Sequence, residues 1–177
     1  MDVLYLKTKP MKTYSLLIIA IILHISGVNA QTPEERIVTL GITLPEVSQP
    51  VANYVKWRRV DNLLFLAGAG ADVKGKLGKD LTIEEGYEAA RLTGINILAT
   101  LKLATGDLSK IKQFVKVHGM VNSSPDFYDQ PKVINGFSDL IVSVFGEKGK
   151  HARAAVGHAT LPFNTAVEIE VIVELEE

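Results

Sequence analysis

The segment from Ala166 to Leu175, AVEIEVIVEL, alternates almost strictly between apolar and acidic side chains. Because successive side chains of a β-strand point to opposite faces of a sheet, this alternation predicts a strand with two unlike faces. One face is entirely aliphatic, with Val167, Ile169, Val171, Val173 and Leu175. The other carries Glu168, Glu170, Ile172 and Glu174. A sheet that contains this strand therefore needs a covering layer on its apolar face.

Two segments ahead of this strand predict the helices of such a layer. Thr82 and Glu85 fit a capping box, and apolar residues then recur every three or four positions up to about Thr105. A second helix is predicted from Gln130 to Phe145, with Asp129 as its N-cap and a glycine after its last residue. The chain thus offers two long helices for one face of a sheet.

Three shorter patterns predict the remaining strands. Residues 53–60 and 63–70, NYVKWRRV and LLFLAGAG, flank Asp61-Asn62, a pair typical of a tight hairpin. Residues 111–121 predict a strand with one face made of Val115, Val117 and Gly119 and the other of Phe114, Lys116 and His118. Residues 152–161, ARAAVGHATL, predict the strand before the last.

The order of these elements is ββαβαββ, behind a short helix that begins with Thr32 and Pro33. It predicts an α+β domain in which both long helices lie on one face of a single mixed sheet. The opposite face would keep apolar residues exposed, so we expect it to be covered. Because no helix is left to cover it, the expected cover is another copy of the protein.

A lone arginine, Arg153, stands in the strand predicted at residues 152–161. It shares a parity with Ala155, Gly157 and Ala159, and we expect this set on the sheet face opposite the helices, together with Glu168. Two interpretations are open. Arg153 forms a structural ion pair with Glu168 or Glu170, or it binds a negatively charged group of a ligand.

Composition excludes several kinds of site. The chain has no cysteine, which rules out disulfides, thiolate metal sites and cysteine nucleophiles. The four histidines lack the spacing of a metal site, so we expect no metal. The sequence shows no partner carboxylate for His118, His151 or His158, and we interpret these three as solvated or packing residues.

Residues 1–30 have the layout of a secretory signal peptide. Lys12 precedes an apolar run from Leu16 to Ile25, and Val28 and Ala30 occupy the −3 and −1 positions of a cleavage site. The run is shorter than the ~20 residues that cross a bilayer, which disfavours an uncleaved anchor. We expect a start at Met11, cleavage after Ala30, and an exported protein, periplasmic or secreted, without stable membrane association.

The remaining residues, 31–177, suit one domain in length. Residues 1–30 hold three lysines and one aspartate, so residues 31–177 carry 16 basic against 19 acidic residues, a formal charge of −3. This part of the chain has no basic tract. Nucleic-acid binding, which depends on neutralising phosphates, is therefore not expected.

Five short motifs resemble those of a known family: Tyr54 in NYV, Gly68 in LLFLAGAG, Asn135 in KVINGFSDL, Arg153 in HARAAVG, and Glu168 in VEIEVI. On these motifs the chain, from about Pro50 to its C-terminus, resembles the Rid family. These are the reactive intermediate deaminases, also called YjgF-like proteins and formerly L-PSP endoribonucleases. The phrases DLTIEEGYEAARLT and DQPKVING are similar to a Rid subgroup of less certain function.

The resemblance implies a chorismate-mutase-like fold, assembled as a homotrimer whose sheets form a central barrel, with ligand sites in the clefts between subunits. It also implies a catalytic pair. Arg153 would bind the carboxylate of a small 2-imino or 2-enamino acid, and Glu168 would position the water that hydrolyses it to a 2-keto acid and ammonia. Tyr54, Gly68 and Asn135 would contribute to substrate binding, and no cofactor is implied.

Two positions depart from well-studied active members of that family. Ala155 stands where they carry a cysteine, and Ala67 stands where they carry a serine. Both differences remove polar groups from the expected cleft. The alternative to a deaminase is therefore a trimer that binds small carboxylates in the same clefts without turning them over.

Overall fold

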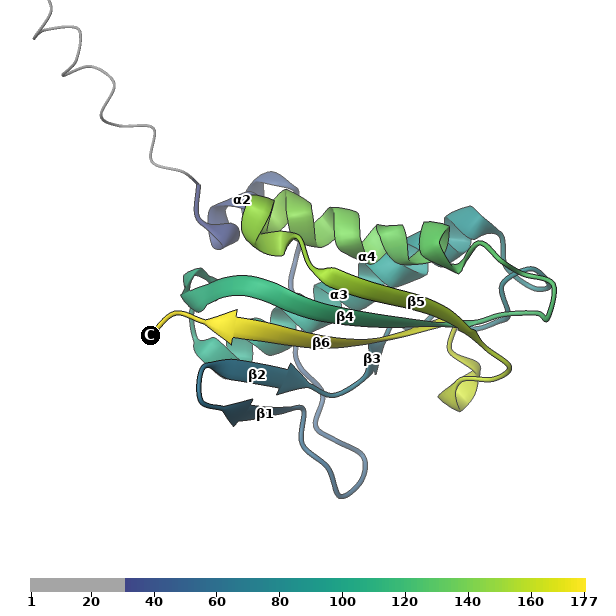
Figure 1. Cartoon of the computed structure of the whole chain (residues 1–177), viewed down its shortest axis with the longest axis horizontal. Helices are drawn as coiled ribbons and strands as arrows, with labels where there is room; N and C mark the ends of the chain where they lie inside the picture. The colour runs from purple at the N-terminus through teal and green to yellow at the C-terminus, as the bar shows by residue number, and fades with distance from the viewer. Residues whose placement is uncertain (1–30) are drawn as a thin grey trace, which may run out of the picture. The chain divides into compact units, whose positions relative to one another are not determined.

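The computed structural model describes residues 31–177, so the expected signal peptide lies outside the described residues. Figure 1 shows a twisted sheet with helices gathered on one side of it. The sheet is mixed, in the order β1-β2-β6-β4-β5. Its members are β1 (Trp57–Val60), β2 (Leu63–Leu66), β4 (Ile111–Asn122), β5 (Ala152–His158) and β6 (Val167–Leu175), and the short β3 (Ala69–Gly70) pairs with β6 beside β2. The predicted mixed sheet is confirmed.

The two long helices begin and end where the sequence predicts. Helix α3 spans Ile83–Thr105 and has a complete capping box, in which Thr82 Oγ1 accepts from the backbone of Glu85. It ends at Gly106, whose φ of 73° is readily adopted only by glycine. Helix α4 spans Gln130–Phe145. Asp129 stands at the N-cap position of α4, but its side chain makes no hydrogen bond to the backbone of the first turn. Its carboxylate instead forms an ion pair with Lys132, with 3.0 Å between Oδ1 and Nζ.

The layer of helices over the sheet contains a third helix in addition to the two long helices predicted there. The short α2 (Pro33–Thr39) buries Ile37 in the common core. Its Glu34 accepts hydrogen bonds from Lys102 Nζ at 2.6 Å and from the backbone nitrogen of Leu108 at 2.8 Å. These bonds attach α2 to the end of α3 and to the 3-10 turn η1 (Leu108–Lys110). No helix within residues 31–177 is long and apolar enough to cross a membrane.

The faces of strand β4 differ from those predicted by simple alternation. Its fully buried residues near the start are Ile111, Phe114 and Val117, three positions apart, and Val115 is exposed. The reason is that the pairing of β4 with β6 shifts register twice, between Ile111 and Gln113 and between Phe114 and Lys116. Each irregularity resets the alternation. The prediction that Phe114 and Val117 lie on opposite faces was therefore wrong.

The face predicted for Arg153 was also wrong. Strand β5 pairs in parallel with β4, and this pairing sets Arg153 beside Val117 and Gly157 beside Val121. Both valines are fully buried under the helices. Because paired residues share a face, Arg153 lies on the helix side of the sheet, whereas Glu168 lies on the other side. Parity within a strand shows which residues share a face, but only pairing shows which face it is.

The sheet face without helices is partly apolar. It exposes Phe65 and Val156, with half-buried Met120 and Ile172 between them. His118 and Glu170 cross this face as a pair, 3.6 Å apart between Nδ1 and Oε2. Figure 1 shows all labelled helices on the opposite face. This face of the chain therefore keeps exposed apolar residues, as the sequence predicts.

Candidate functional site

The Arg153 side chain is held at the junction of β5 and α4. Its Nη1 donates to Asn135 Oδ1 at 2.9 Å and to Ser138 Oγ at 3.0 Å. Asn135 and Ser138 are three residues apart and so lie on one face of α4. Among residues 31–177, no acceptor bonds to the Nε or Nη2 of Arg153, and no carboxylate pairs with it. The edge of the guanidinium formed by Nε and Nη2 is thus available for a bidentate carboxylate.

A histidine for which no role beyond solvation or packing was predicted, His151, extends this cluster. His151 Nδ1 lies 2.7 Å from the carbonyl oxygen of Gly149, and its Nε2 lies 3.1 Å from Ser138 Oγ. A carbonyl only accepts, so Nδ1 carries the proton and Nε2 accepts from the Ser138 hydroxyl. That hydroxyl can then receive the bond from Arg153. The chain of bonds runs from Gly149 through His151 and Ser138 to Arg153.

The surroundings of His151 keep it neutral. Its ring packs near Phe114 and Phe137, with centroids 6.5 and 5.9 Å away. Burial lowers the pKa of His151, the charge of Arg153 lowers it further, and the hydrogen bond to Gly149 partly opposes both. Of the two predicted roles, solvated or packing, these contacts favour packing. The bond of His151 to Ser138 was missed, because no spacing in the sequence shows that the residue before β5 lies next to that position of α4.

We expect the stabilising effect of His151 to weaken in acid. A lowered pKa means that the unfolded chain binds the proton more readily than the folded one, so stability falls as the pH drops below the ordinary value of about 6.5. Urea unfolding of the wild type and of His151→Gln at pH 7.5 and pH 5.0 measures this. The wild type should exceed the variant in free energy of unfolding by less at pH 5.0 than at pH 7.5. A constant difference would contradict a buried, neutral His151, because all other titrating groups are common to both proteins.

A second group of predicted residues lines a hollow of about 580 Å³ beside β3 and β6. Tyr54, Gly68 and Glu168 all contribute to its wall, as does Ala67. A Cβ at position 68 would overlap Oε1 of Glu168 and lie 3.0 Å from its Cδ. Gly68 is therefore the residue that leaves space for the Glu168 carboxylate.

The pKa of the Glu168 carboxyl lies above its ordinary value, which favours the protonated form. Burial raises its pKa, and the neighbouring negative charge of Glu170 raises it further, whereas His158 acts in the opposite direction. A carboxyl group with a raised pKa exchanges protons more readily near neutral pH than an ordinary glutamate does. This is a property that a general acid or base requires.

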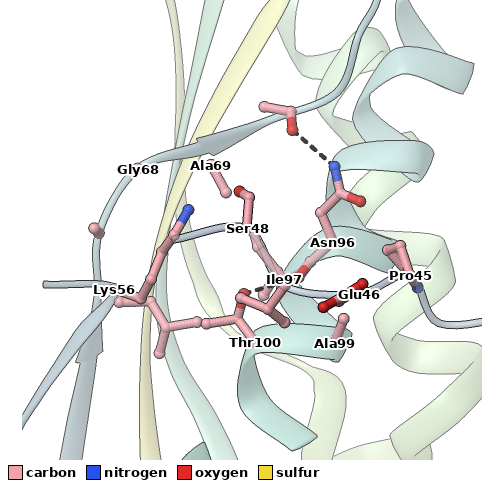
Figure 2. Close-up of a pocket in the computed structure, with 14 residues that line it drawn as sticks. Pro45, Glu46, Ser48, Lys56, Gly68, Ala69, Asn96, Ile97, Ala99 and Thr100 are labelled. Atoms are coloured by element: carbon pink, nitrogen blue, oxygen red, sulfur yellow. Dashed lines mark hydrogen bonds between the residues drawn. The ribbon is translucent and has the colours of Figure 1, made fainter. Parts of the chain in front are cut away.

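A further hollow, of about 330 Å³, lies between α3 and the segment that joins β2 to β3 (Figure 2). Asn96 spans part of it, and its Nδ2 donates to the carbonyl oxygen of Gly70 at 2.8 Å. Lys56 extends its ammonium group into the same space. Ala67, Gly68 and Gly70 border both hollows, so Asn96 fixes a segment that also shapes the Glu168 wall. Sequence reasoning identified neither Lys56 nor Asn96.

The predicted site residues thus fall into two groups. Arg153 and Asn135 are in direct contact on the helix side of the sheet. Tyr54, Gly68 and Glu168 share a hollow that does not include Arg153. One chain therefore carries both groups without bringing them together. Ala155 packs against the hydrophobic core below Arg153.

Residues 34–175 match the sequence model of the family described as "YjgF/chorismate mutase-like, putative endoribonuclease". The chain belongs to this family. The match spans most of the chain and includes both groups of candidate residues. It also confirms the resemblance that the five motifs indicate, and the chorismate-mutase-like character of the fold.

Two relatives are similar over most of their length. Protein TCP17 from Trypanosoma cruzi is 46% identical over 143 residues, which cover 77% of this chain and 89% of that protein. The crystal structure of protein Atu1372 from Agrobacterium tumefaciens, described as of unknown function, has 47% identity and a TM-score of 0.76, with 81% of this chain and 92% of that chain covered. Neither description states an activity.

RidA from the Antarctic bacterium Psychrobacter sp. PAMC 21119 is a more distant structural neighbour. It has 25% identity and a TM-score of 0.50, with 75% of this chain and 98% of that chain covered. This YjgF-like protein is thus more similar in sequence to both TCP17 and Atu1372 than to RidA. Its function has to be inferred from its own site.

Proposed function

We propose that this YjgF-like protein hydrolyses small 2-imino or 2-enamino acids to 2-keto acids and ammonia, in clefts between the subunits of a homotrimer. The observation that carries the proposal is the separation of the two candidate groups. Arg153 has a free carboxylate-binding edge on the helix side of the sheet, and Glu168 lines a hollow on the other side. Each is half of a site, which a neighbouring subunit would complete.

The chemistry follows from the two halves. The planar guanidinium of Arg153 binds the substrate carboxylate through two parallel hydrogen bonds. Glu168 of the neighbouring subunit takes a proton from a bound water, which attacks the C2 carbon of the imine. The carboxyl group returns this proton to the nitrogen, which gives a carbinolamine. It then passes the hydroxyl proton of the carbinolamine to the nitrogen, so that the C2=O bond forms as the C2–N bond breaks. The products are the 2-keto acid and ammonia, and the reaction needs no oxidant or cofactor.

A non-catalytic binding role is the second candidate, and two residues favour it. Ala67 lines the Glu168 hollow, and Ala155 follows Arg153 by two residues in β5 and packs against the core, where active relatives are expected to carry polar residues. In this case the clefts would retain small carboxylates without turnover. In either role, we propose that the protein acts after export. RNA cleavage fits the surface poorly, because residues 31–177 carry a formal charge of −3.

Subunit complementation tests the proposed site. Arg153→Ala and Glu168→Gln are each expected to abolish imine hydrolysis, measured as the decay of an imine that an amino-acid oxidase generates in the assay. Coexpression of the two variants with different tags gives mixed trimers. If each site takes its arginine and its glutamate from different chains, random mixing restores about a quarter of the wild-type sites.

The outcome separates three cases. Activity near one third of the wild-type level in the purified doubly tagged trimers, which each have one intact site of three, supports the shared site if neither parent is active. Absence of activity in the mixed trimers, when the wild type is active, would show that Arg153 and Glu168 must come from one chain. If the wild type itself leaves imine decay unchanged but its melting temperature rises with 2-keto acids, the binding role is correct.

A further inference from the structure

An aromatic side chain at the rim of the Glu168 hollow has no role in packing. Phe163 lies in the 3-10 turn η3 (Pro162–Asn164) between β5 and β6, and it is 84% exposed. It lines the hollow beside Glu168 and Tyr54. Folding gains nothing from an aromatic ring that stays in water, so the ring is available to contact a ligand.

The backbone at Phe163 is held in a conformation that disfavours this residue. Its φ and ψ are 57° and 21°, and the φ of Asn164 is 56°. A bulky residue such as phenylalanine rarely adopts this left-handed region, whereas glycine does so at little cost. A phenylalanine at this place is therefore not explained by local preference.

The surrounding structure keeps the turn in this shape. The Asn164 carbonyl accepts from the backbone nitrogen of Gly75 at 3.0 Å, and Asn164 Oδ1 accepts from Nδ2 of the buried Asn122 at 3.0 Å. On the other side, Thr165 Oγ1 donates to the carbonyl oxygen of Ala71 at 3.2 Å. These bonds fix the C-terminal end of the turn, directly after Phe163, and so hold its ring at the mouth of the hollow.

The rest of the mouth has the same apolar character. Val51 and Tyr54 are exposed apolar residues that line the hollow, and Pro162 lies next to Phe163 in the turn. The charged residues at the rim, Asp72 and Lys74, pair with each other at 3.1 Å. A substrate whose carboxylate is bound by arginine and whose C2 carbon lies at Glu168 would project its side chain toward this rim.

We propose that Phe163 determines substrate specificity and that the enzyme favours 2-imino acids with aromatic or large aliphatic side chains over small ones. The proposal rests on the proposed deaminase site and adds the class of substrate to it. Stacking or edge contact with the ring, together with burial of the apolar side chain, supplies the preference. A 2-imino acid whose side chain is only a methyl group makes no comparable contact with the Phe163 ring.

Binding of the product 2-keto acids tests this without relying on turnover. Phenylpyruvate and pyruvate are titrated into the full chain by isothermal titration calorimetry. The wild type should bind phenylpyruvate at least about tenfold more tightly, the effect expected of one buried aromatic contact. Phe163→Ala should reduce the ratio of the Kd for pyruvate to the Kd for phenylpyruvate at least about fivefold. Phe163→Tyr, which keeps an aromatic ring, should have the wild-type ratio.

Further variants distinguish specificity from a structural role. Phe163→Gly removes the ring and suits a positive φ, so it should lose selectivity with an equal or higher melting temperature. Val38→Ala, which shortens an exposed apolar residue on α2, should keep the wild-type ratio. Light scattering should give one assembly size for all variants. A smaller assembly for Phe163→Ala would overturn the proposal, because Phe163 would then be a subunit contact.

The two hypotheses fail in different ways. If the wild type and Phe163→Ala show the same ratio, the specificity proposal is wrong and the deaminase site stands. If neither keto acid binds to the wild type at millimolar concentration, the proposed function fails and the specificity proposal fails with it.

Discussion

Replacing Arg153 by lysine is expected to lower kcat/KM for imine hydrolysis at least about 100-fold, because a bidentate contact to the substrate carboxylate is lost. Nη1 of Arg153 is already engaged by Asn135 and Ser138, which leaves two other guanidinium nitrogens for the ligand. A lysine has a single nitrogen. It can bond to the two α4 residues or reach the ligand, but it cannot reproduce both contacts in the same geometry.

The fold should tolerate this replacement. Arg153 is only partly buried and its contacts are two neutral side chains, so we expect the free energy of unfolding to change by less than about 1 kcal/mol. Steady-state kinetics with the imine generated in the assay, alongside urea unfolding, measures both effects. Arg91→Lys is the matched control, because Arg91 pairs with Glu88 on the surface of α3 and lies outside both groups. Retention of a third of the wild-type kcat/KM by Arg153→Lys would show that the carboxylate is bound elsewhere.

The regular parts of the fold follow from local signals in the sequence. Helix α3 starts at a capping box and stops at a glycine with positive φ, and both determinants lie within a few residues of the ends they define. The alternation from Val167 to Leu175, broken only by Ile172, predicts the buried face of β6 correctly. Local chemistry decides these features, so a single sequence contains enough information to predict them.

The features that were not predicted depend on pairing between distant segments. The irregularities in β4 arise where Phe114 and Lys116 meet β6, and nothing within residues 111–121 marks them. The orientation of Arg153 depends on the parallel pairing of β5 with Val117 of β4. Pairing of this kind is a property of the sheet as a whole, and alternation within one strand does not contain it.

For the candidate site, the sequence indicates residues to consider but not how they are arranged. The family motifs identify Arg153 and Glu168, and the structure shows that one chain holds them on opposite faces of the sheet. Ser138 was missed, although its position three residues after Asn135 places both on one helix face. That spacing becomes informative only once α4 is known to lie against β5, where Ser138 meets His151.

Replacing Gly136 by alanine is expected to lower the free energy of unfolding by at least about 3 kcal/mol, the upper end of the cost of overpacking. Gly136 lies in α4 where that helix crosses α3. A Cβ at this position would overlap the carbonyl oxygen of Tyr87 and lie 2.8 Å from its carbonyl carbon and 3.2 Å from the backbone nitrogen of Arg91. These are backbone atoms of a helix, which cannot move aside without separating α3 from α4.

Gly94→Ala is the matched control for this prediction. Gly94 lies in α3, at the same contact between the helices, but its added Cβ would meet the ends of side chains, Leu140 Cδ2 at 2.8 Å and Phe137 Cδ2 at 3.1 Å. Both replacements gain the same ~1 kcal/mol of helix propensity, so the difference between them isolates the backbone clash. Urea unfolding of the two variants and the wild type should show a much larger loss for Gly136→Ala. Equal stability of the two variants would mean that moving the backbones of α3 and α4 apart at Gly136 costs no more free energy than moving the Leu140 side chain away from position 94. In that case the close approach of the backbones would not hold the helix layer over the sheet, and the position of Asn135 and Ser138 next to Arg153 would need another support.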